Sequence, residues 1–301
     1  MTPSSKLVFF GNERLVSGLT HTDAPVLRGL IAAGYEIKAI VSHHSEARSR
    51  NARPLEVAEI AEQYNIPLLL PERPGDIEEE LRAFQADAAV LVAYGRIIPQ
   101  RIINVFTPRG IINIHPSLLP RHRGPTPIET TILSGDKQAG VSVMQLTAGM
   151  DEGPVYVQSS FPLHGDETKQ ALYELLASTS AKLLIDSLPR ILSGELTPIP
   201  QQNIDVTYTS MLSKDDSKID ALTDNAYAIE RKVRAYLNFP KTRLKIKNND
   251  VIITTAKVVN KTCEDHLVIP CAENTYLEVT ELIAPSGKTM SGEAFLRGYA
   301  K

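Results

Sequence analysis

One stretch of the chain decides the fold: Gly110-Ile111-Ile112-Asn113-Ile114-His115-Pro116-Ser117-Leu118-Leu119-Pro120-Arg121-His122-Arg123-Gly124. It begins with a short apolar run over 110–114, which is typical of a buried strand in a parallel sheet. Asn113 and His115 are two residues apart, so on a strand their side chains point to the same face. A polar loop follows at once. The stretch therefore predicts a sheet that carries an amide and an imidazole near the end of one strand.

Apolar runs alternate with helical patterns on both sides of this stretch. Strands are expected over 7–10, 37–41, 66–70, 88–93 and 155–161, and helices over 25–33, 54–64, 77–84 and 168–188. This alternation predicts an α/β fold with a doubly wound, Rossmann-like, mostly parallel sheet. Ligands of such sheets bind beyond the carboxyl ends of the strands. We therefore expect the segments 93–95 and 117–120, which both follow strands, at the binding edge.

The sequence changes character after residue 193. The segment 193–203 has two prolines and many polar residues, which is typical of a linker. A helix over 225–235 and short strands over 243–246, 251–259, 266–269 and 276–282 follow. Such strands predict a small, OB-like β-barrel. We therefore expect a first domain over 1–194, a linker over 195–206 and a smaller β-barrel domain over 207–301.

The composition excludes several classes of protein. The 301 residues are 43% hydrophobic and 22% charged, and the net charge of −3 excludes a bulk binder of polyanions. Two cysteines make neither a disulfide framework nor a zinc site, so no metal is expected. The polar start of the chain does not resemble a signal peptide, and no apolar run is long enough to span a bilayer. A cytoplasmic protein without membrane contact is expected.

Three polar residues form the candidate catalytic set. Asn113 and His115 share one strand, and Asp151 lies on the turn Gly149-Met150-Asp151-Glu152-Gly153 after the next strand-like run. An amide can donate to an oxyanion, an imidazole can carry a proton, and a carboxylate can orient or activate either group. Alone, Asn113 or His115 is better explained by a structural role in a loop, and Asp151 fits a structural role in its turn equally well. Together they favour acyl or formyl transfer without a covalent enzyme intermediate.

These motifs resemble those of the folate-dependent formyltransferases. The resemblance rests on Asn113-x-His115, on the run 117–124 and on Met150-Asp151-Glu152-Gly153. Within that superfamily the chain resembles the members that act on methionyl initiator tRNA. The further signs are Pro125-x-Pro127-Ile128, Tyr208, the run 212–216 with Ile219-Asp220, and a C-terminal module of suitable size.

The resemblance implies a reaction and a set of site residues. A formyl group would pass from 10-formyltetrahydrofolate, a co-substrate, to the α-amine of methionyl initiator tRNA for translation initiation. Asn113, His115 and Asp151 would be catalytic in the domain 1–194. The C-terminal barrel would contact tRNA, and a monomer is expected. The residues that would bind the folate are Ser117, Leu118, Leu119, Pro120, Ala93, Tyr94 and Gly95.

Two basic segments are candidates for tRNA contact. Arg48, Arg50 and Arg53 lie in a loop that the resemblance places at the acceptor end of the tRNA, and arginine suits phosphate and base-edge contacts. The loop lacks the lysines and glycines common in the family, so a solvated surface loop is the alternative. In the tail, nine Lys and Arg residues lie between 231 and 261 against the single acid Asp250, with Lys245 and Lys247 among them.

Other interpretations stay open at this point. The chain could be a formyltransferase of the superfamily that acts on a small amine, either a ribonucleotide or an amino sugar. It could also be an RNA- or folate-binding protein without catalysis. Arg121 and Arg123 fit contact with an anionic ligand or a plain surface role, and His122 is expected in solvent. The segment 11–23 is longer than is common in the family, and its role is open.

Overall fold

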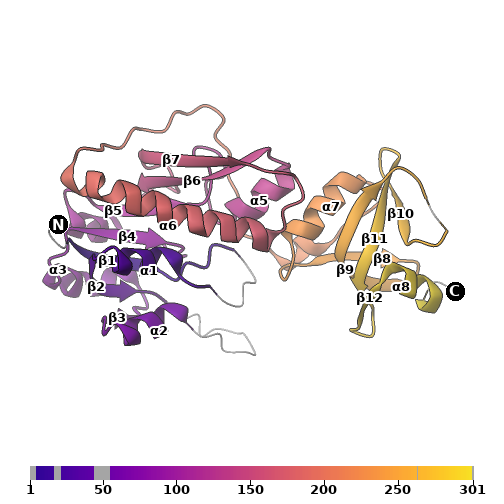
Figure 1. The fold of residues 1–301 in the computed structure, drawn as a ribbon, viewed down its shortest axis with the longest axis horizontal. Helices are drawn as coiled ribbons and strands as arrows, with labels where there is room; N and C mark the ends of the chain where they lie inside the picture. Colours follow the sequence, from indigo (N-terminus) through magenta and orange to yellow (C-terminus); the bar gives the residue numbers. More distant parts are fainter. Residues whose placement is uncertain (1–4, 17–21, 44–54, 263, 300–301) are drawn as a thin grey trace.

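The computed structural model describes residues 5–16, 22–43, 55–262 and 264–299. Its larger sheet has seven strands in the order β3-β2-β1-β4-β5-β6-β7 (Figure 1). The first five in chain order pair in parallel, while β6 and β7 are antiparallel to their neighbours. These strands are β1 (Lys6–Gly11), β2 (Glu36–Val41), β3 (Leu68–Leu69), β4 (Ala88–Val92), β5 (Ile111–His115), β6 (Gln138–Gln145) and β7 (Val155–Pro162). The mostly parallel α/β sheet confirms the predicted fold class.

Both faces of this sheet are buried, which explains its nearly continuous apolar strands. On β1, Leu7 and Phe9 belong to the larger core, whereas Val8 and Phe10 belong to a second core on the opposite face. The longest helix of the described residues, α6 (Lys169–Ser193), is capped by Thr168 at its start and by Gly194 after its end, where the φ of 83° suits glycine. The helices of this part are α1 (Pro25–Ala32), α2 (Glu56–Gln63), η1 (Pro74–Ile77), α3 (Glu78–Ala83), α4 (Gln100–Ile103), η2 (Asn104–Phe106), α5 (Pro127–Ser134) and α6 (Lys169–Ser193).

The C-terminal part is an antiparallel half-barrel with its own core. Its strands run in the order β10-β11-β9-β8, and β12 pairs with β11. Ile229 of α7 and Phe295 of α8 are buried against Leu277 and Val279 of β11. The elements are η3 (Lys214–Ser217), α7 (Ala226–Ala235), β8 (Thr242–Ile246), β9 (Asn249–Val259), β10 (Val268–Cys271), β11 (Thr275–Ile283), β12 (Thr289–Ser291) and α8 (Gly292–Tyr299). The predicted small β-rich module is therefore present.

The two parts touch through helices as well as through the connecting chain. Helices α5 and α7 lie side by side at the junction (Figure 1). The Lys169 ammonium donates to the carbonyl of Phe239 at 3.0 Å, and Arg234 donates to the carbonyl of Glu167 at 2.8 Å. These contacts join α6 and the turn before it to the half-barrel. The domain limits at 194 and 207 stay predictions.

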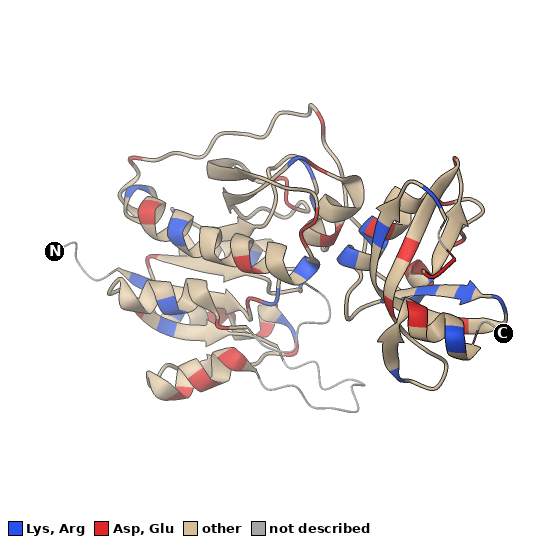
Figure 2. Ribbon diagram, turned by 45° about the vertical axis from the view of Figure 1, so that its right-hand side comes forward, with Lys and Arg blue, Asp and Glu red and all other residues tan. Residues whose placement is uncertain are grey.

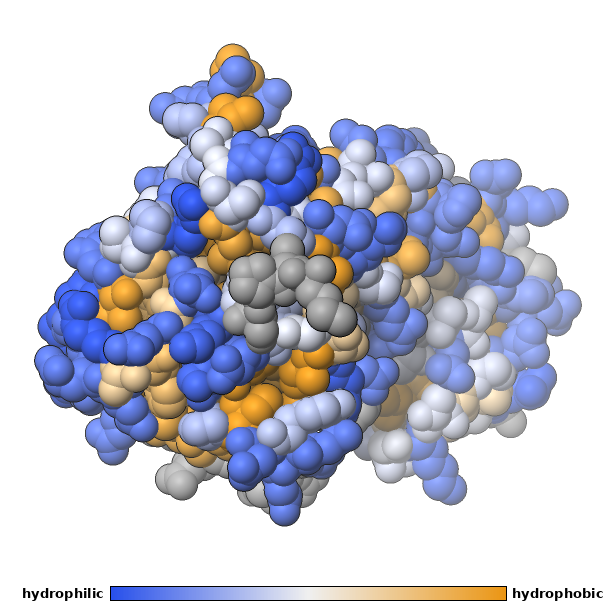
Figure 3. Space-filling view, turned by 60° about the vertical axis from the view of Figure 1, so that its left-hand side comes forward, coloured by the Kyte–Doolittle hydropathy of each residue, from blue (hydrophilic) through white to orange (hydrophobic). Residues whose placement is uncertain are grey.

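The surface is mixed in character. Hydrophilic residues surround smaller apolar patches on the face shown in Figure 3, as is usual for folded proteins. None of the helices in the described residues is both long enough and apolar enough to cross a lipid bilayer.

Candidate active site

Asn113 and His115 lie on the same face of β5, as their spacing predicts. Ile112 and Ile114, which alternate with them, point into the larger hydrophobic core. β5 pairs with β4 on one side and with β6 on the other. Both polar residues are only 5% exposed. The strand therefore holds an amide and an imidazole in a sheltered position near its carboxyl end.

Asp151 approaches this pair from the turn that joins β6 to β7. Its backbone is left-handed, with a φ of 51°. Its carboxylate Oδ2 accepts a hydrogen bond from the backbone N–H of Gly124 at 2.8 Å and lies 3.6 Å from Nδ1 of His115. Only glycine suits position 153, because a Cβ there would lie 1.8 Å from the carbonyl oxygen of Gln145. The turn thus packs closely on β6 and brings the carboxylate to the imidazole.

The other ring nitrogen of His115 is also engaged. Nε2 lies 2.9 Å from the backbone carbonyl oxygen of His122. A carbonyl can only accept, so Nε2 carries a proton and donates it. The imidazole is therefore fixed with Nδ1 toward Asp151. By contrast, the side-chain amide of Asn113 has no hydrogen-bond partner among the residues described.

Gln201 holds the turn of Asp151 in place. Its Nε2 donates to the backbone carbonyls of Asp151 at 2.7 Å and Gly153 at 2.8 Å. Its Oε1 accepts two hydrogen bonds from the Arg123 guanidinium, at 2.8 and 3.1 Å. A single side chain from the connecting segment therefore supports the candidate catalytic turn. Our sequence interpretation missed Gln201, because the residue lies in a proline-rich stretch that was interpreted only as a linker.

The structure corrects the expectations for two residues of the 117–124 run, Arg123 and His122. Arg123 is buried and bonded to Gln201, so it neither coats the surface nor is open to an anion. His122 is buried too, and its Nε2 lies 2.6 Å from Oδ2 of Asp136, so the expected solvated histidine was wrong. Arg121 is more exposed and pairs with the same carboxylate at 2.8 Å. Sequence reasoning gave no sign of Asp136 as their common partner.

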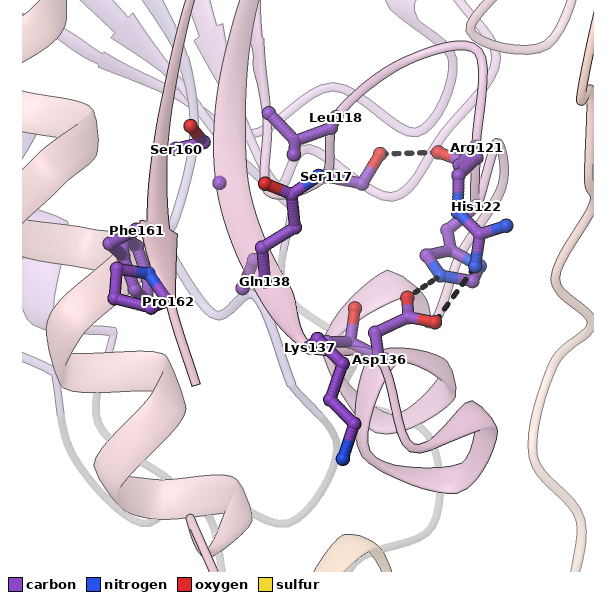
Figure 4. Close-up of a pocket in the computed structure, with 13 residues that line it drawn as sticks. Ser117, Leu118, Arg121, His122, Asp136, Lys137, Gln138, Ser160, Phe161 and Pro162 are labelled. Atoms are coloured by element: carbon purple, nitrogen blue, oxygen red, sulfur yellow. Dashed lines mark hydrogen bonds and ion pairs between the residues drawn. The ribbon is translucent and has the colours of Figure 1, made fainter. Parts of the chain in front are cut away.

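Two of the expected folate residues line a described cavity. Ser117 and Leu118 belong to the wall of a cavity of about 590 Å³, which also includes Arg121, His122 and Asp136 (Figure 4). The Ser117 hydroxyl does not point freely into it, because it donates to the backbone carbonyl of Arg121 at 2.7 Å. Leu119 and Pro120 are not part of this wall.

The other expected folate residues follow β4, the neighbour of β5 in the sheet. Ala93 and Gly95 have left-handed backbones, with φ of 50° and 73°. Between them, Tyr94 is buried with its ring edge-on against Phe10 and His43. Burial raises the pKa of Tyr94 and lowers that of His43, the latter with help from the Arg96 charge. The segments after β4 and β5 thus share one edge of the sheet. Ala93, Tyr94 and Gly95 are, however, not part of the wall of the cavity lined by Ser117 and Leu118.

The expected tRNA residues are divided between two regions. Arg48, Arg50 and Arg53 lie outside the described residues. Lys245 and Lys247 are exposed on and just after β8. Figure 2 shows Lys and Arg residues spread over this part of the molecule. Other basic residues of the tail form ion pairs with acidic residues. These pairs include Lys232 with Asp224, Arg234 with Glu230, and Lys257 with Glu278.

The segment after β1 carries a buried carboxyl group. Glu13 accepts hydrogen bonds from the backbone N–H groups of Val26 and Leu27, at 3.0 and 2.7 Å, at the start of α1. Burial raises the pKa of Glu13 to about 7, although these hydrogen bonds act in the opposite direction. Part of the long segment 11–23 therefore caps a helix.

No group of three or more His, Cys, Asp or Glu side chains in the described ranges is arranged to hold a metal ion. The candidate site is built instead from an amide, an imidazole and a carboxylate. Such groups bind, orient and exchange protons.

Comparison with known proteins identifies the class first. The family model "Formyl transferase" matches residues 14–188, and "Formyl transferase, C-terminal domain" matches residues 211–300. The methionyl-tRNA formyltransferase of Halorhodospira halophila is 35% identical over 91% of this chain and 92% of its own length. That of Chloroflexus aggregans is 36% identical over 90% and 92%. The chain therefore belongs to the formyl transferase family, among the methionyl-tRNA formyltransferases.

A solved structure supports the fold. An N-formyltransferase from Helicobacter canadensis, in complex with folinic acid and dTDP-3-aminofucose, superposes with a TM-score of 0.69. The match covers 91% of this chain and 98% of the other, at 18% sequence identity. The family resemblance that we inferred from the motifs is confirmed.

Proposed function

We propose that this protein transfers the formyl group of 10-formyltetrahydrofolate to the α-amine of methionyl initiator tRNA, for translation initiation. The observation that carries the proposal is the meeting of His115 and Asp151, 3.6 Å apart, next to Asn113 in a chain of this family. All three groups come from one chain, so a monomer suffices. The reaction would take place in the cytoplasm, where tRNA is used.

In the proposed reaction the methionine amine attacks the formyl carbon. A bond forms between the amine nitrogen and that carbon, and the carbonyl oxygen becomes an oxyanion. The bond from the carbon to the folate nitrogen then breaks. The free amide of Asn113 donates a hydrogen bond to the oxyanion. The loss of one such donor typically lowers the rate by about 10²–10³.

The amine must lose a proton, and the folate nitrogen must gain one. Both nitrogens of His115 are engaged within the protein, because Nε2 donates to His122 and Nδ1 faces Asp151. This geometry favours the Asp151 carboxylate and Nδ1 as the place where the proton is held between the two steps. Asn113 is then the main oxyanion donor, and His115 contributes charge and orientation.

The folate is proposed to bind over the carboxyl edge of β4 and β5. Ala93, Tyr94 and Gly95 follow β4, and the 117–120 segment follows β5, which is the usual place for ligands in such sheets. Three sheltered polar atoms near this edge have no hydrogen-bond partner among the described residues: Ser42 Oγ, His43 Nδ1 and Tyr94 OH. Buried polar groups usually have partners, so these atoms suit contacts with a bound heterocycle.

The tRNA is proposed to contact the half-barrel through Lys245 and Lys247. Arg243 lies two residues before Lys245 on β8 and is exposed as well, so both can face one phosphate backbone. The segment 44–54, with Arg48, Arg50 and Arg53, lies outside the described residues and is proposed from the sequence to contact the acceptor end.

A transfer assay with labelled 10-formyltetrahydrofolate tests the function. Charged initiator tRNA, charged elongator methionine tRNA, an aminoribonucleotide and an amino sugar are offered side by side as acceptors. Formylation of the initiator tRNA supports the proposal. Transfer only to a small amine, or tight RNA binding with no turnover, would replace it with one of the alternatives.

A further inference from the structure

Tyr208 is an exposed aromatic residue that is firmly held. It is 58% exposed, yet its hydroxyl accepts from Arg123 Nη1 at 3.1 Å and donates to Glu152 Oε1 at 3.0 Å. Backbone hydrogen bonds to Arg123 hold the residues on either side of Tyr208. The Arg123 N–H donates to Thr207 O at 2.9 Å, and the Thr209 N–H donates to Arg123 O at 2.7 Å. Tyr208 is thus held by hydrogen bonds at its hydroxyl end, while much of the side chain is exposed to solvent.

The position of this ring links it to the candidate catalytic turn. Glu152, which binds the tyrosine hydroxyl, directly follows Asp151. Arg123 lies with its guanidinium carbon 5.7 Å from the ring centre and is joined to the same turn through Gln201. On the other side of Asp151, Met150 is also 58% exposed. An exposed aromatic ring is therefore hydrogen-bonded to the turn that carries the Asp151 carboxylate.

We propose that the Tyr208 ring stacks against the terminal base of the charged tRNA. The inference rests on the proposed function and names the part of the substrate that this surface binds. Methionine is esterified to the terminal ribose, so the terminal base lies only a few bonds from the reacting amine. A base over Tyr208 would hold that amine beside Asp151.

A planar base fits this surface better than the methionine side chain does. A rigid ring loses little conformational freedom on binding, and every base offers a π-face to an aromatic residue. The two hydrogen bonds of the Tyr208 hydroxyl and the nearby Arg123 guanidinium hold the ring in place, which favours stacking of a planar group. Stacking of this kind is sequence-tolerant, so it positions the acceptor end without reading its sequence.

The test combines variants of Tyr208 with a change in the RNA. Transfer is measured with charged initiator tRNA and with a chemically charged tRNA whose terminal nucleotide lacks its base. Tyr208→Ala and Tyr208→Leu should each lower kcat/KM on intact tRNA on the order of 10-fold. Tyr208→Phe should lose clearly less than either, because it keeps the aromatic ring and loses only the two hydrogen bonds of the hydroxyl. Tyr227, on α7, is 54% exposed and distant in sequence, so Tyr227→Ala serves as the matched control.

The base-free tRNA decides the proposal. On the base-free tRNA, kcat/KM of the wild type should be about 10-fold lower than on intact tRNA, and Tyr208→Leu should lower kcat/KM no further. If the loss in kcat/KM from Tyr208→Leu multiplied the loss from removing the base, Tyr208 would bind another part of the substrate, such as the methionine side chain. That result would overturn the inference. A Leu variant as active as wild type on intact tRNA would overturn it as well. Failure of the proposed function looks different, because the wild type would then formylate neither tRNA.

Discussion

The imidazole of His115 and the carboxylate of Asp151 face each other, with Nδ1 3.6 Å from Oδ2. Each partner has a second anchor, since Nε2 of His115 donates to His122 and Oδ2 of Asp151 accepts from Gly124. Both backbone anchors belong to the loop after β5. The same loop therefore orients the acid and the imidazole before any substrate arrives, which is the preorganisation that transfer without a covalent intermediate requires.

Gln201 should act as a positioning residue for Asp151. Replacement by Ala removes both hydrogen bonds to the turn of Asp151 and leaves the Arg123 guanidinium without its amide partner. We expect kcat to fall on the order of 10²-fold, because small shifts of a catalytic group are costly, while KM for folate changes little. Steady-state kinetics with each substrate varied in turn measures this.

The matched control for this variant is Gln202→Ala, because Gln202 is the exposed neighbour. It should leave both constants near wild type. Equal kcat and KM values for Gln201→Ala and Gln202→Ala would show that Gln201 does not position Asp151.

The exposed pair on β8 should contribute electrostatically to RNA binding. In the double variant Arg243→Gln and Lys245→Gln, the affinity for charged tRNA should fall at low salt. The slope of log affinity against log salt should become shallower by roughly 1.5, since about 0.7–0.9 is expected for each phosphate contact. Binding titrations over a salt series measure the slope. Lys182→Gln, at an exposed position on α6, is the control, and an unchanged slope in the β8 variant would argue against this surface.

The segment 44–54 gives a separate prediction from the sequence. Changing Arg48 and Arg50 together to Ala should raise KM for tRNA far more than KM for 10-formyltetrahydrofolate, because these arginines are expected to contact the acceptor end. Initial rates with each substrate varied distinguish the two constants. Equal rises in both would speak against a role in RNA binding.

Glu13 should make folding stability depend on pH. Its pKa is raised from 4.5 to about 7 in the folded protein, so the folded state holds this proton more tightly than the unfolded state. Stability from this group is therefore complete below about pH 4.5, falls as the pH rises to about 7, and is constant above. Between pH 5 and pH 8 the wild type should lose roughly 2–3 kcal/mol more unfolding free energy than Glu13→Gln. Denaturant titrations at both pH values test this, and parallel losses in the two proteins would contradict it.

Local patterns were sufficient to predict much of the fold. β1 and β4 are largely apolar and buried on both faces, so their runs were clear in the sequence. Helix α5 was not predicted, because it is short and carries Thr130, Thr131 and a buried Glu129. Helix α8 begins at Gly292, which is not a helix-favouring residue, and was missed as well.

The same contrast holds for the candidate site. The shared face of Asn113 and His115 follows from their spacing, because both lie on one strand. Gln201 could not be inferred in this way, since its partners Asp151 and Arg123 lie 50 and 78 residues away in the chain. His122 was wrongly expected in solvent because its partner Asp136 lies 14 residues further on, between α5 and β6. Contacts between distant segments thus supplied what the sequence pattern lacked.

The most direct test of the central claim is transfer from 10-formyltetrahydrofolate to methionyl initiator tRNA by Asp151→Ala in a single turnover. Thermal melting and RNA affinity are measured on the same sample. We predict that transfer is abolished while folding and tRNA affinity stay close to those of the wild type. Transfer at near-wild-type rate by a folded Asp151→Ala protein would contradict the account.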